Sequence, residues 1–196
     1  MFGAERSRRS GLAAVASVEE WLQSLDIRVT VETLADGNVD RAVQLFNKTN
    51  QMNLATRRLS KSELEGWAAA PEHCLLTFRV CDRFGDSGLT GIVGLRLEGP
   101  EAHLVDFLLS CRVLGRNVEE TMLHVAVAQC RARRASTLRA EFRPTARNKP
   151  CLDFFRRSGL RAAGEHMFIW DASQPYERPR SVSVLDQTGV ATALDP

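Results

Sequence analysis

The sequence predicts one mixed α/β domain (α/β, or α+β), with a mixed central β-sheet that carries helices on both faces. Three observations predict it. Helix-like and strand-like hydrophobic patterns follow in the order helix pair, hairpin, strand, turn, helix, strand, helix, strand. The stretch strand–turn–helix–strand forms a βαβ unit, and ligands tend to bind at the turn of such a unit. The length of 196 residues suits one domain with a full hydrophobic core.

The predicted helices begin at capping signals. Ser17 with Glu20 and Ser60 with Glu63 have the form of the capping box. The Asp-Gly-Asn turn at 36–38 can cap a further helix. The predicted helices are a short one after Ser17, Val39–Asn47, one from Ser60 that ends before Pro71, Val118–Arg133, and Asn148–Ser158 ended by Gly159.

The predicted strands are apolar or alternating runs bounded by turn residues. The glycine-bearing loop 82–88 joins two of them in a hairpin. The strands are expected at Ile27–Leu34, Cys74–Cys81, Leu89–Leu97, Ala102–Ser110, Thr137–Phe142 and Met167–Trp170. The domain is therefore expected over residues 16–171, between a flexible arm at 1–15 and a proline-bearing tail at 172–196.

Composition and charge exclude several classes of partner. Lys and Arg number 26 against 24 Asp and Glu, and this net charge of +2 is too balanced to predict nucleic-acid binding. No apolar run approaches the roughly 20 residues that cross a bilayer, so no membrane partner is expected. The five cysteines form no CxxC pair and no Cys/His ligand spacing, which predicts reduced thiols, no metal and a cytoplasmic location.

Residues 112–117, Arg-Val-Leu-Gly-Arg-Asn, follow a predicted strand and open a predicted helix. The free N–H groups of a first helical turn, together with the helix dipole, favour an anion at such a place. Gly115 lets the backbone approach a ligand closely, and Arg112 and Arg116 can pair with phosphate. An ordinary glycine turn with two solvated arginines explains the same residues equally well, because short glycine motifs recur by chance.

Two motifs resemble those of the GNAT acyltransferase family. Residues 112–117 are similar to its motif Gln/Arg-x-x-Gly-x-Gly/Ala, which holds the pyrophosphate of acyl-CoA, although Asn117 replaces the last small residue. Residues 148–160 are similar to its motif Asn-x-x-Ala-x-x-Phe-Tyr-x-x-x-Gly-Phe. The resemblance implies the GNAT fold and a thioester of coenzyme A or phosphopantetheine as the bound substrate. The implied cofactor-binding residues are Leu109, Cys111, Arg112, Val113, Leu114, Gly115, Arg116, Asn117 and Asn148.

Longer stretches resemble the C-terminal part of the FkbH-like proteins of polyketide and nonribosomal peptide pathways. Residues 44–58 read QLFNKTNQMNLATRR, close to the signature QLxNKTNQFNLTTRR. Residues 82–86 and 107–116 extend a match that covers residues 10–170 or thereabouts. Such proteins generally carry a haloacid-dehalogenase (HAD) domain first. This sequence lacks the Asp-x-Asp-x-Thr/Val motif of that chemistry, so the activities of the HAD domain cannot be carried over.

The candidate catalytic residues lie near these motifs. Many GNAT enzymes protonate the departing thiolate with a tyrosine where this chain has Phe155. Cys111, beside Arg112, is a candidate nucleophile or acyl carrier, because a helix N-terminus and an arginine lower the pKa of a thiol. The favoured alternative makes Cys111 a small buried residue under the turn. Asp106 is a candidate general base, or else a polar residue on the exposed or edge side of its strand.

Some polar residues are expected to be structural. Glu141 and His166 lie on strands at the border of the expected cleft, and each is favoured as a structural residue. Arg131, Arg133 and Arg134 form a basic helix end. That end is either a solvated face that complements the helix dipole or a dock for an acidic carrier protein.

The polar segment Lys48–Arg58 is expected to be an irregular or helical connection. Its amides and hydroxyls are poor helix material and are costly to bury without partners. They form either a wall that binds a small polar acyl unit or a network that fixes a loop. The candidate substrate-binding residues are Asn50, Gln51, Asn53, Thr56 and Arg57.

The leading hypothesis is an acyltransferase that engages a small polar acyl thioester on coenzyme A or an acyl carrier protein, in secondary metabolism. A non-catalytic module that docks an acyl carrier protein is the alternative favoured by Phe155. A decarboxylase of acyl thioesters is the third hypothesis. The expected partners are an acyl carrier protein and a separate HAD-type protein.

Overall fold

The computed structural model describes residues 17–189, and the arm predicted at 1–15 lies outside them. In chain order the elements are α2 (Val18–Ser24), β1 (Ile27–Thr33), α3 (Val39–Lys48), β2 (Met52–Asn53), α4 (Lys61–Ala68), β3 (His73–Asp82), β4 (Gly85–Glu98), β5 (Glu101–Leu109), the 3-10 helix η1 (Cys111–Val113), α5 (Val118–Ala132), β6 (Thr137–Glu141), α6 (Lys149–Arg157), β7 (Arg161–Ala162), β8 (Met167–Asp171) and β9 (Val182–Asp186). None of the helices within this range is long and apolar enough to cross a membrane.

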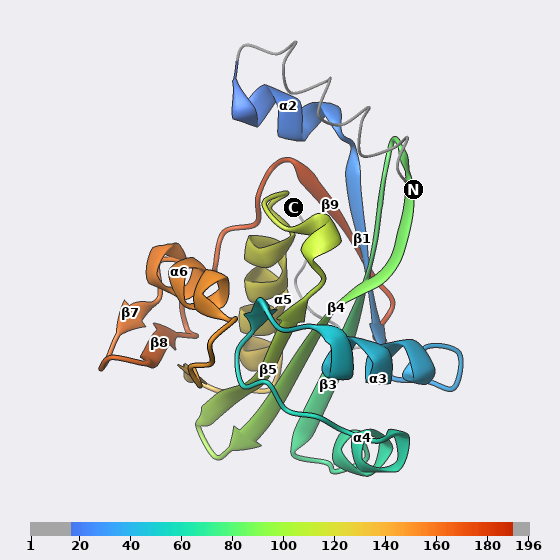
Figure 1. Cartoon of the computed structure of the whole chain (residues 1–196). Coiled ribbons are helices and arrows are strands. Elements are labelled where there is room, and N and C mark those ends of the chain that lie inside the picture. Colours follow the sequence, from blue (N-terminus) through green and yellow to red (C-terminus); the bar gives the residue numbers. More distant parts are fainter. Residues whose placement is uncertain (1–16, 190–196) are drawn as a thin grey trace.

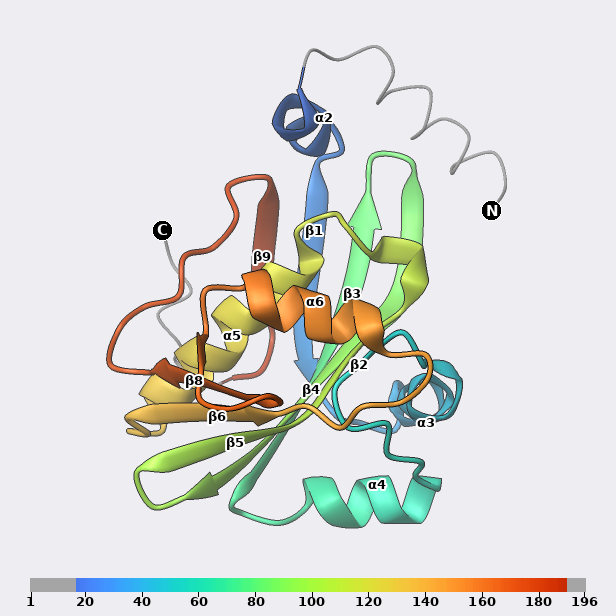
Figure 2. The ribbon, with the colours of Figure 1, turned by 60° about the vertical axis from the view of Figure 1, so that its left-hand side comes forward.

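The strands form one mixed sheet in the order β7-β8-β6-β5-β4-β3-β1-β9, and β2 pairs with β5 outside this order. The pairs β1·β3, β3·β4, β4·β5, β6·β8 and β7·β8 are antiparallel, whereas β5·β6 and β1·β9 are parallel. Figures 1 and 2 show the long, twisted central strands and the helices around them. The mixed sheet predicted from the sequence is confirmed.

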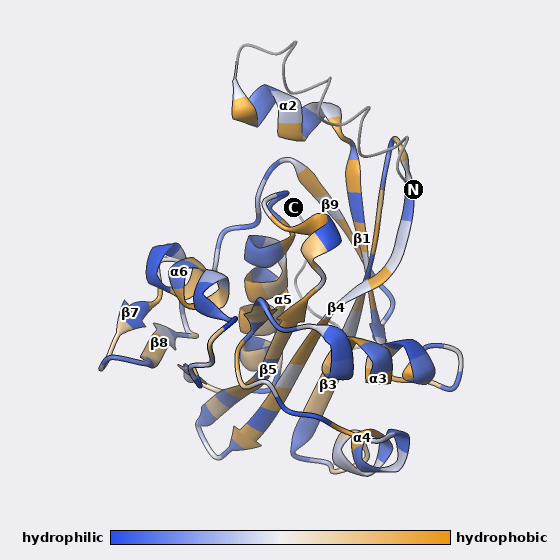
Figure 3. Ribbon diagram, viewed as in Figure 1, coloured by the Kyte–Doolittle hydropathy of each residue, from blue (hydrophilic) through white to orange (hydrophobic). Residues whose placement is uncertain are grey.

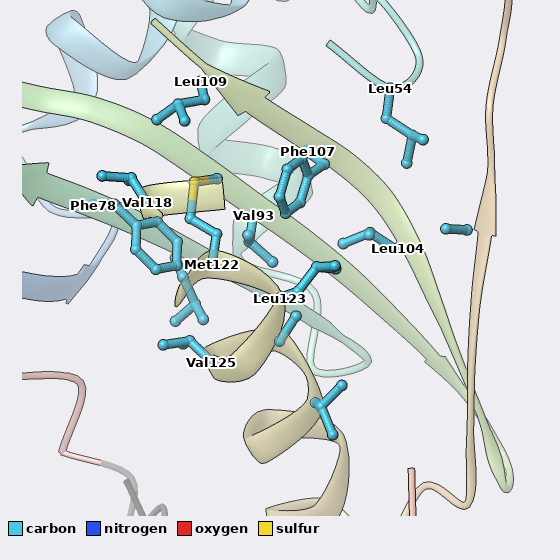
Figure 4. Packing of buried hydrophobic residues seen from close by; sticks show 14 of the residues in the cluster. Leu54, Phe78, Val93, Leu104, Phe107, Leu109, Val118, Met122, Leu123 and Val125 are labelled. Atoms are coloured by element: carbon cyan, nitrogen blue, oxygen red, sulfur yellow. The ribbon is translucent and has the colours of Figure 1, made fainter. Parts of the chain in front are cut away.

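The two faces of the sheet are covered by different helices. Neighbouring β4 residues point to opposite faces, so that Val93 joins the core beneath α5 and Ile92 joins the core beneath α3 and α4. Met122 and Phe78 belong to the α5 side, whose packing is shown in Figure 4. In Figure 3, hydrophobic and hydrophilic residues alternate along strands such as β1 and β5, and the visible turns of α3 are mainly hydrophilic. A helix that is apolar on one side only is typical of a surface helix over a sheet.

Both capping signals are confirmed. The Ser17 side chain accepts a hydrogen bond from the Glu20 N–H at the start of α2. Ser60 and Glu63 exchange the two reciprocal hydrogen bonds of the capping box at the start of α4. The hairpin of β3 and β4 has a much tighter loop than predicted, because both strands continue toward Asp82 and Gly85.

The prediction of a tail over 172–196 is wrong in its central part. Residues Val182–Asp186 form β9, which pairs in parallel with β1. Val182 lies opposite Ile27 and is buried, whereas Leu185 is largely exposed. The prolines before this segment suggested a loose end, yet five alternating residues suffice to cover the outer edge of β1.

The parallel strands β5 and β6 separate after a short ladder. Glu101–Leu104 pair with Thr137–Ala140, and beyond Leu104 the neighbour of β5 is β2. The Leu54 N–H donates to the Phe107 carbonyl at 3.1 Å, and the Arg143 N–H donates to the Leu54 carbonyl at 2.9 Å. Residues 52–54 therefore fill the gap between the separated strands as an added strand would.

Candidate functional site

The turn between β5 and α5 has the backbone that its sequence predicts. Gly115 has a φ of 72° and Asn117, the N-cap of α5, has a φ of 60°. Nothing lies within 4 Å of the position that a Cβ at Gly115 would take. Glycine is therefore favoured here by its left-handed backbone conformation and not by a close contact.

The turn already holds an anion that belongs to the chain itself. The Gly115 N–H donates to the Glu119 carboxylate Oε1 at 2.7 Å, and Glu119 is only 2% exposed. Burial raises the pKa of Glu119, and the hydrogen bond from Gly115 opposes that rise. The second carboxylate oxygen, Oε2, has no hydrogen-bond partner among the described residues. A phosphate at this N–H would first have to displace the carboxylate of Glu119.

The side chains of Arg116 and Asn117, two of the predicted cofactor-binding residues, are also bonded within the fold. Arg116 forms an ion pair with Asp82 at 3.2 Å, and the exposed fractions of the two side chains are 7% and 2%. Arg116 also donates to the Arg112 carbonyl at 2.7 Å. The Asn117 Nδ2 donates to Ser181 Oγ at 2.9 Å, which ties the turn to the segment before β9. Both side chains therefore fasten the turn to other parts of the fold.

An open cleft of about 510 Å³ lies between α3 and the end of β5. Its lining includes four cationic side chains and, among the described residues, no acidic one. The cations are Arg41, Lys48, Arg112 and Arg147, and together with this hollow they are called the basic cleft below. A smaller cleft of about 300 Å³ shares Arg41 and Arg112 with it and continues toward Arg79.

Arg41 and Arg112 are positioned by neutral acceptors. The Arg41 Nε donates to the Leu89 carbonyl at 3.2 Å, and its Nη1 donates to Gln44 Oε1 at 3.1 Å. The Arg112 Nε donates to Ser110 Oγ at 3.3 Å. Burial, and secondly the charge of Arg112, lower the pKa of Arg41. Two like charges thus stand near each other, and neither forms an ion pair within residues 17–189.

Cys111 is exposed and lines the basic cleft, so the alternative that it is buried under the turn is wrong. The 3-10 turn explains the difference, because it buries Val113 two residues later instead. Of the other predicted cofactor residues, Leu109 and Arg112 line the cleft, and Leu114 is partly buried. The three cysteines Cys74, Cys130 and Cys151 are buried, and burial raises the pKa of the last two to about 12.

The polar side chains of the segment before α4 divide between a cleft and a loop-fixing network. Asn50 and Gln51 line the basic cleft. Asn53 is fully buried, donates to the Thr49 carbonyl at 2.9 Å and accepts from the Thr56 N–H at 2.7 Å. Asn53 and the Thr56 N–H therefore help to fix the loop, and the assignment of these two residues to substrate binding stays a prediction.

Asp106 and Arg57 form a buried ion pair across two elements. Asp106 has no exposed surface, and both of its oxygens accept hydrogen bonds from Arg57. Burial raises the pKa of Asp106, and the charge and hydrogen bonds of Arg57 oppose that rise. A Cβ at Gly94 would lie 2.7 Å from Asp106 Oδ2, so glycine makes room for the pair. Asp106 as a general base and Arg57 as a substrate ligand stay predictions, and in this fold each side chain is bound to the other.

The second GNAT-like motif is structural in this chain. Phe155 is fully buried, with ring centroids 5.3 Å from Phe107 and 5.5 Å from Phe168. Asn148 is buried and donates to the carbonyls of Asn53 at 3.0 Å and Arg143 at 2.8 Å. The Asn148 amide therefore fastens the start of α6 to the segment that carries β2, and its contact with a cofactor stays a prediction.

The remaining polar candidates stand apart from the basic cleft. Glu141 is exposed and lines another cleft, of about 430 Å³, together with Arg57. His166 is half-buried against the Phe142 ring, with centroids 5.7 Å apart. Their expected structural role involves no contact with Cys111 or its cleft.

Sequence reasoning missed three of the four cations of the basic cleft. Arg41 and Lys48 are seven residues apart on α3, with Gln44 between them, and this spacing places all three on one side of a helix. That spacing is the signal that could have found them. Arg147 carried no such signal, since only the fold brings the loop before α6 to the cleft.

No protein-family model matches the chain, and no curated protein matches it in sequence. Solved structures match its fold. The spermidine N-acetyltransferase of Vibrio cholerae in complex with CoA and spermine has 15% identity and a TM-score of 0.57, over 74% of this chain and 96% of that one. The ribosomal-protein-S18-alanine N-acetyltransferase of Escherichia coli has 13% identity and a TM-score of 0.53, over 72% and 90%.

An N-acetyltransferase of Staphylococcus aureus Mu50 has 9% identity and a TM-score of 0.56, over 74% of this chain and 98% of that one. Identities this low show the fold and nothing further. The chain has the GNAT fold, as its two motifs implied. The finer resemblance to FkbH-like proteins stays a prediction.

Proposed function

We propose that this protein is a GNAT-fold acyltransferase that engages a small polar acyl thioester of coenzyme A or an acyl carrier protein, in polyketide or other secondary-metabolite biosynthesis. The observation that carries the proposal is the basic cleft, which opens beside Cys111 where β5 ends. A cleft of one charge sign attracts ligands of the opposite sign, and both phosphopantetheine and acidic carrier proteins are anionic. The pathway and the carrier rest on the sequence resemblance.

Transfer of the acyl group does not require a strong general acid in this site. An acceptor attacks the thioester carbonyl, the bond from carbon to sulfur breaks, and the thiol leaves with the acceptor's proton. A thiol has a pKa of about 8.5, so a thiolate leaves more readily than an alkoxide or an amide. Phe155, buried among aromatic rings, supplies no proton, and Cys111 is the exposed thiol beside the cleft. Cys111 is thus the first candidate for a residue that accepts the acyl group.

A non-catalytic docking module for a carrier protein is the second candidate, and it too has observations in its favour. Glu119 occupies the Gly115 N–H, and residues 52–54 occupy the edge of β5 where it leaves β6. Because residues of the chain itself already bond to these backbone groups, the groups need no thioester as a hydrogen-bond partner. In this reading the basic cleft binds an acidic surface and releases nothing.

Release of thiol separates the two functions. The protein is incubated with a panel of acyl-CoA and acyl-carrier thioesters, with and without hydroxyl and amine acceptors, and free thiol is measured. The acyltransferase should release thiol in proportion to enzyme, and Cys111→Ala should lower the rate. Arg161→Gln is a matched control, because Arg161 is an exposed arginine on β7 outside the cleft. Saturable binding of the carrier with no thiol release across the panel would leave the docking module as the better account.

A further inference from the structure

The β5–α5 turn and the basic cleft differ in how their charges are neutralised. At the turn, the Gly115 N–H is bonded to Glu119 at 2.7 Å, and Arg116 is paired with Asp82 at 3.2 Å. A phosphate that approached the Gly115 N–H would meet the buried carboxylate of Glu119, which already accepts that hydrogen bond. Removing that carboxylate from its hydrogen bond costs free energy, and leaving it nearby repels a second anion.

In the basic cleft, by contrast, the cations have no acidic neighbour in the lining among the described residues. Lys48 and Arg147 make no side-chain hydrogen bond or ion pair within residues 17–189, and Arg41 and Arg112 bond only to neutral acceptors. Four positive charges around one hollow repel one another. Burial, and secondly the charge of Arg112, lower the pKa of Arg41. An anion in the hollow removes this repulsion and gains attraction from each of the four groups.

The geometry of the arginines suits a phosphate. Both guanidiniums are held through Nε, by the Leu89 carbonyl and Ser110 Oγ. Among the described residues, the Nη2 of Arg41 and both terminal nitrogens of Arg112 have no hydrogen-bond partner, whereas the Nη1 of Arg41 donates to Gln44. Planar guanidiniums bind phosphate oxygens in pairs, and their charge-assisted hydrogen bonds are stronger than neutral ones. A hollow of about 510 Å³ is also within the ordinary size of a small-molecule site.

We propose that the phosphate of the phosphopantetheine thioester binds in the basic cleft, between Arg41 of α3 and Arg112 of the turn, with Lys48 and Arg147 as the outer cations, and not on the Gly115 turn. The proposal deepens the proposed function and rests on it only for the identity of the ligand. It places the anion on the α3 side of β5, beside the Cys111 thiol. At the turn, the carboxylate of Glu119 takes the place of an external anion.

Calorimetry with coenzyme A, with a holo acyl carrier protein and with inorganic pyrophosphate tests the site. Arg41→Gln and Lys48→Gln should each weaken binding of all three ligands about tenfold, which corresponds to about 1.4 kcal/mol. Arg161→Gln should leave binding unchanged. Pantetheine without its phosphate should bind equally to the parent protein and to the two cleft variants. Lys48 is exposed, and its side chain makes no hydrogen bond or ion pair within residues 17–189, so that variant tests the site even if Arg41→Gln lowers stability.

Glu119→Gln discriminates between the two positions. Its amide oxygen can still accept the Gly115 hydrogen bond, but the negative charge is gone. If the phosphate binds in the cleft, the Glu119→Gln variant and the parent protein should differ in their affinity for the three ligands by less than about threefold, since the turn is not the phosphate site. A rise of tenfold or more, with cleft variants unchanged, would place the phosphate on the turn and overturn the proposal.

The readouts keep this site distinct from the proposed enzyme activity. Ligand binding that is weakened by Arg41→Gln and Lys48→Gln, without any release of thiol, would support the phosphate site and refute the acyltransferase. Thiol release with an unchanged KM for acyl-CoA and acyl-carrier substrates in the cleft variants would refute the site and support the acyltransferase. If none of the three ligands binds the parent protein at millimolar concentration, the site is refuted.

Discussion

Two groups of arginines in this fold differ in what neutralises them. Arg57 belongs to the loop before α4 and donates to both oxygens of the fully buried Asp106. Its Cζ lies over the Trp67 ring, 5.1 Å from the ring centroid. Arg41 and Arg112 line an open cleft and have no acidic partner within the described residues. The first group holds the chain together, whereas the second has charge left for a ligand. Residue type alone does not distinguish the two, since all three residues are arginines.

The largest expected effect comes from breaking the buried pair. Arg57→Met leaves the carboxylate of Asp106 buried without its cation, and loss of one partner of a buried pair costs about 3–5 kcal/mol. Urea denaturation at pH 7 measures the change in the free energy of unfolding. The variant should also become less stable as pH rises above about 3.9, the pKa of an unperturbed aspartate, because burial raises the folded pKa of Asp106 and its ionised form is then unfavourable.

The control for Arg57→Met is an ion pair that is exposed to solvent. Arg28 and Asp26 lie 2.6 Å apart with exposed fractions of 64% and 59%, and Arg28→Met should change stability little. Equal losses from Arg57→Met and Arg28→Met would mean that burial does not separate the two kinds of arginine.

Phe155→Tyr should cost about 1–3 kcal/mol, because the added hydroxyl enters a fully buried aromatic cluster that offers no partner. Thermal unfolding measures the loss, and a thiol-release assay follows in parallel. No large gain in rate is expected, since the hydroxyl lies within the core. A well-folded variant with rates raised 100-fold would show instead that the chain lacks only the tyrosine acid.

Glu119→Gln should raise stability at pH 7 by about 1 kcal/mol, since it removes a buried charge with one unpartnered oxygen. The sign follows from the raised pKa of Glu119. The parent protein loses stability as pH rises above about 4.3, the unperturbed glutamate value, up to the folded pKa. The advantage of the variant should therefore disappear below pH 4, and an advantage that persists at pH 3 would contradict this origin.

The smallest effect is expected in the cleft. Arg112→Gln removes one of two like charges without leaving a buried partner behind, so the free energy of unfolding should stay within about 0.5 kcal/mol of the parent. Binding of coenzyme A should still fall about tenfold. A loss of stability as large as that of Arg57→Met would show that Arg112 also has a structural role and would remove the distinction between the two groups.

The elements whose patterns are local were predictable from the sequence. The capping pairs at Ser17 and Ser60, the apolar spacing of α5 and the strands of the central sheet are short-range signals, and the structure confirms them. The turn 110–117 was located correctly for the same reason. Its motif implied the GNAT fold, which the similarity to solved structures supports.

What only the tertiary structure decided is which side chains those elements leave unpaired. Asp106 and Arg57 are 49 residues apart, and Arg116 and Asp82 are 34 apart, so no local pattern shows that these charges neutralise each other. The edge strand β9 depended on the distant partner β1, and the gap beside β5 was filled by residues 52–54 from another part of the chain. The sequence determined the elements because hydrophobic period and capping are local. The fold determined the site because charge pairing and burial depend on contacts between residues far apart in the chain.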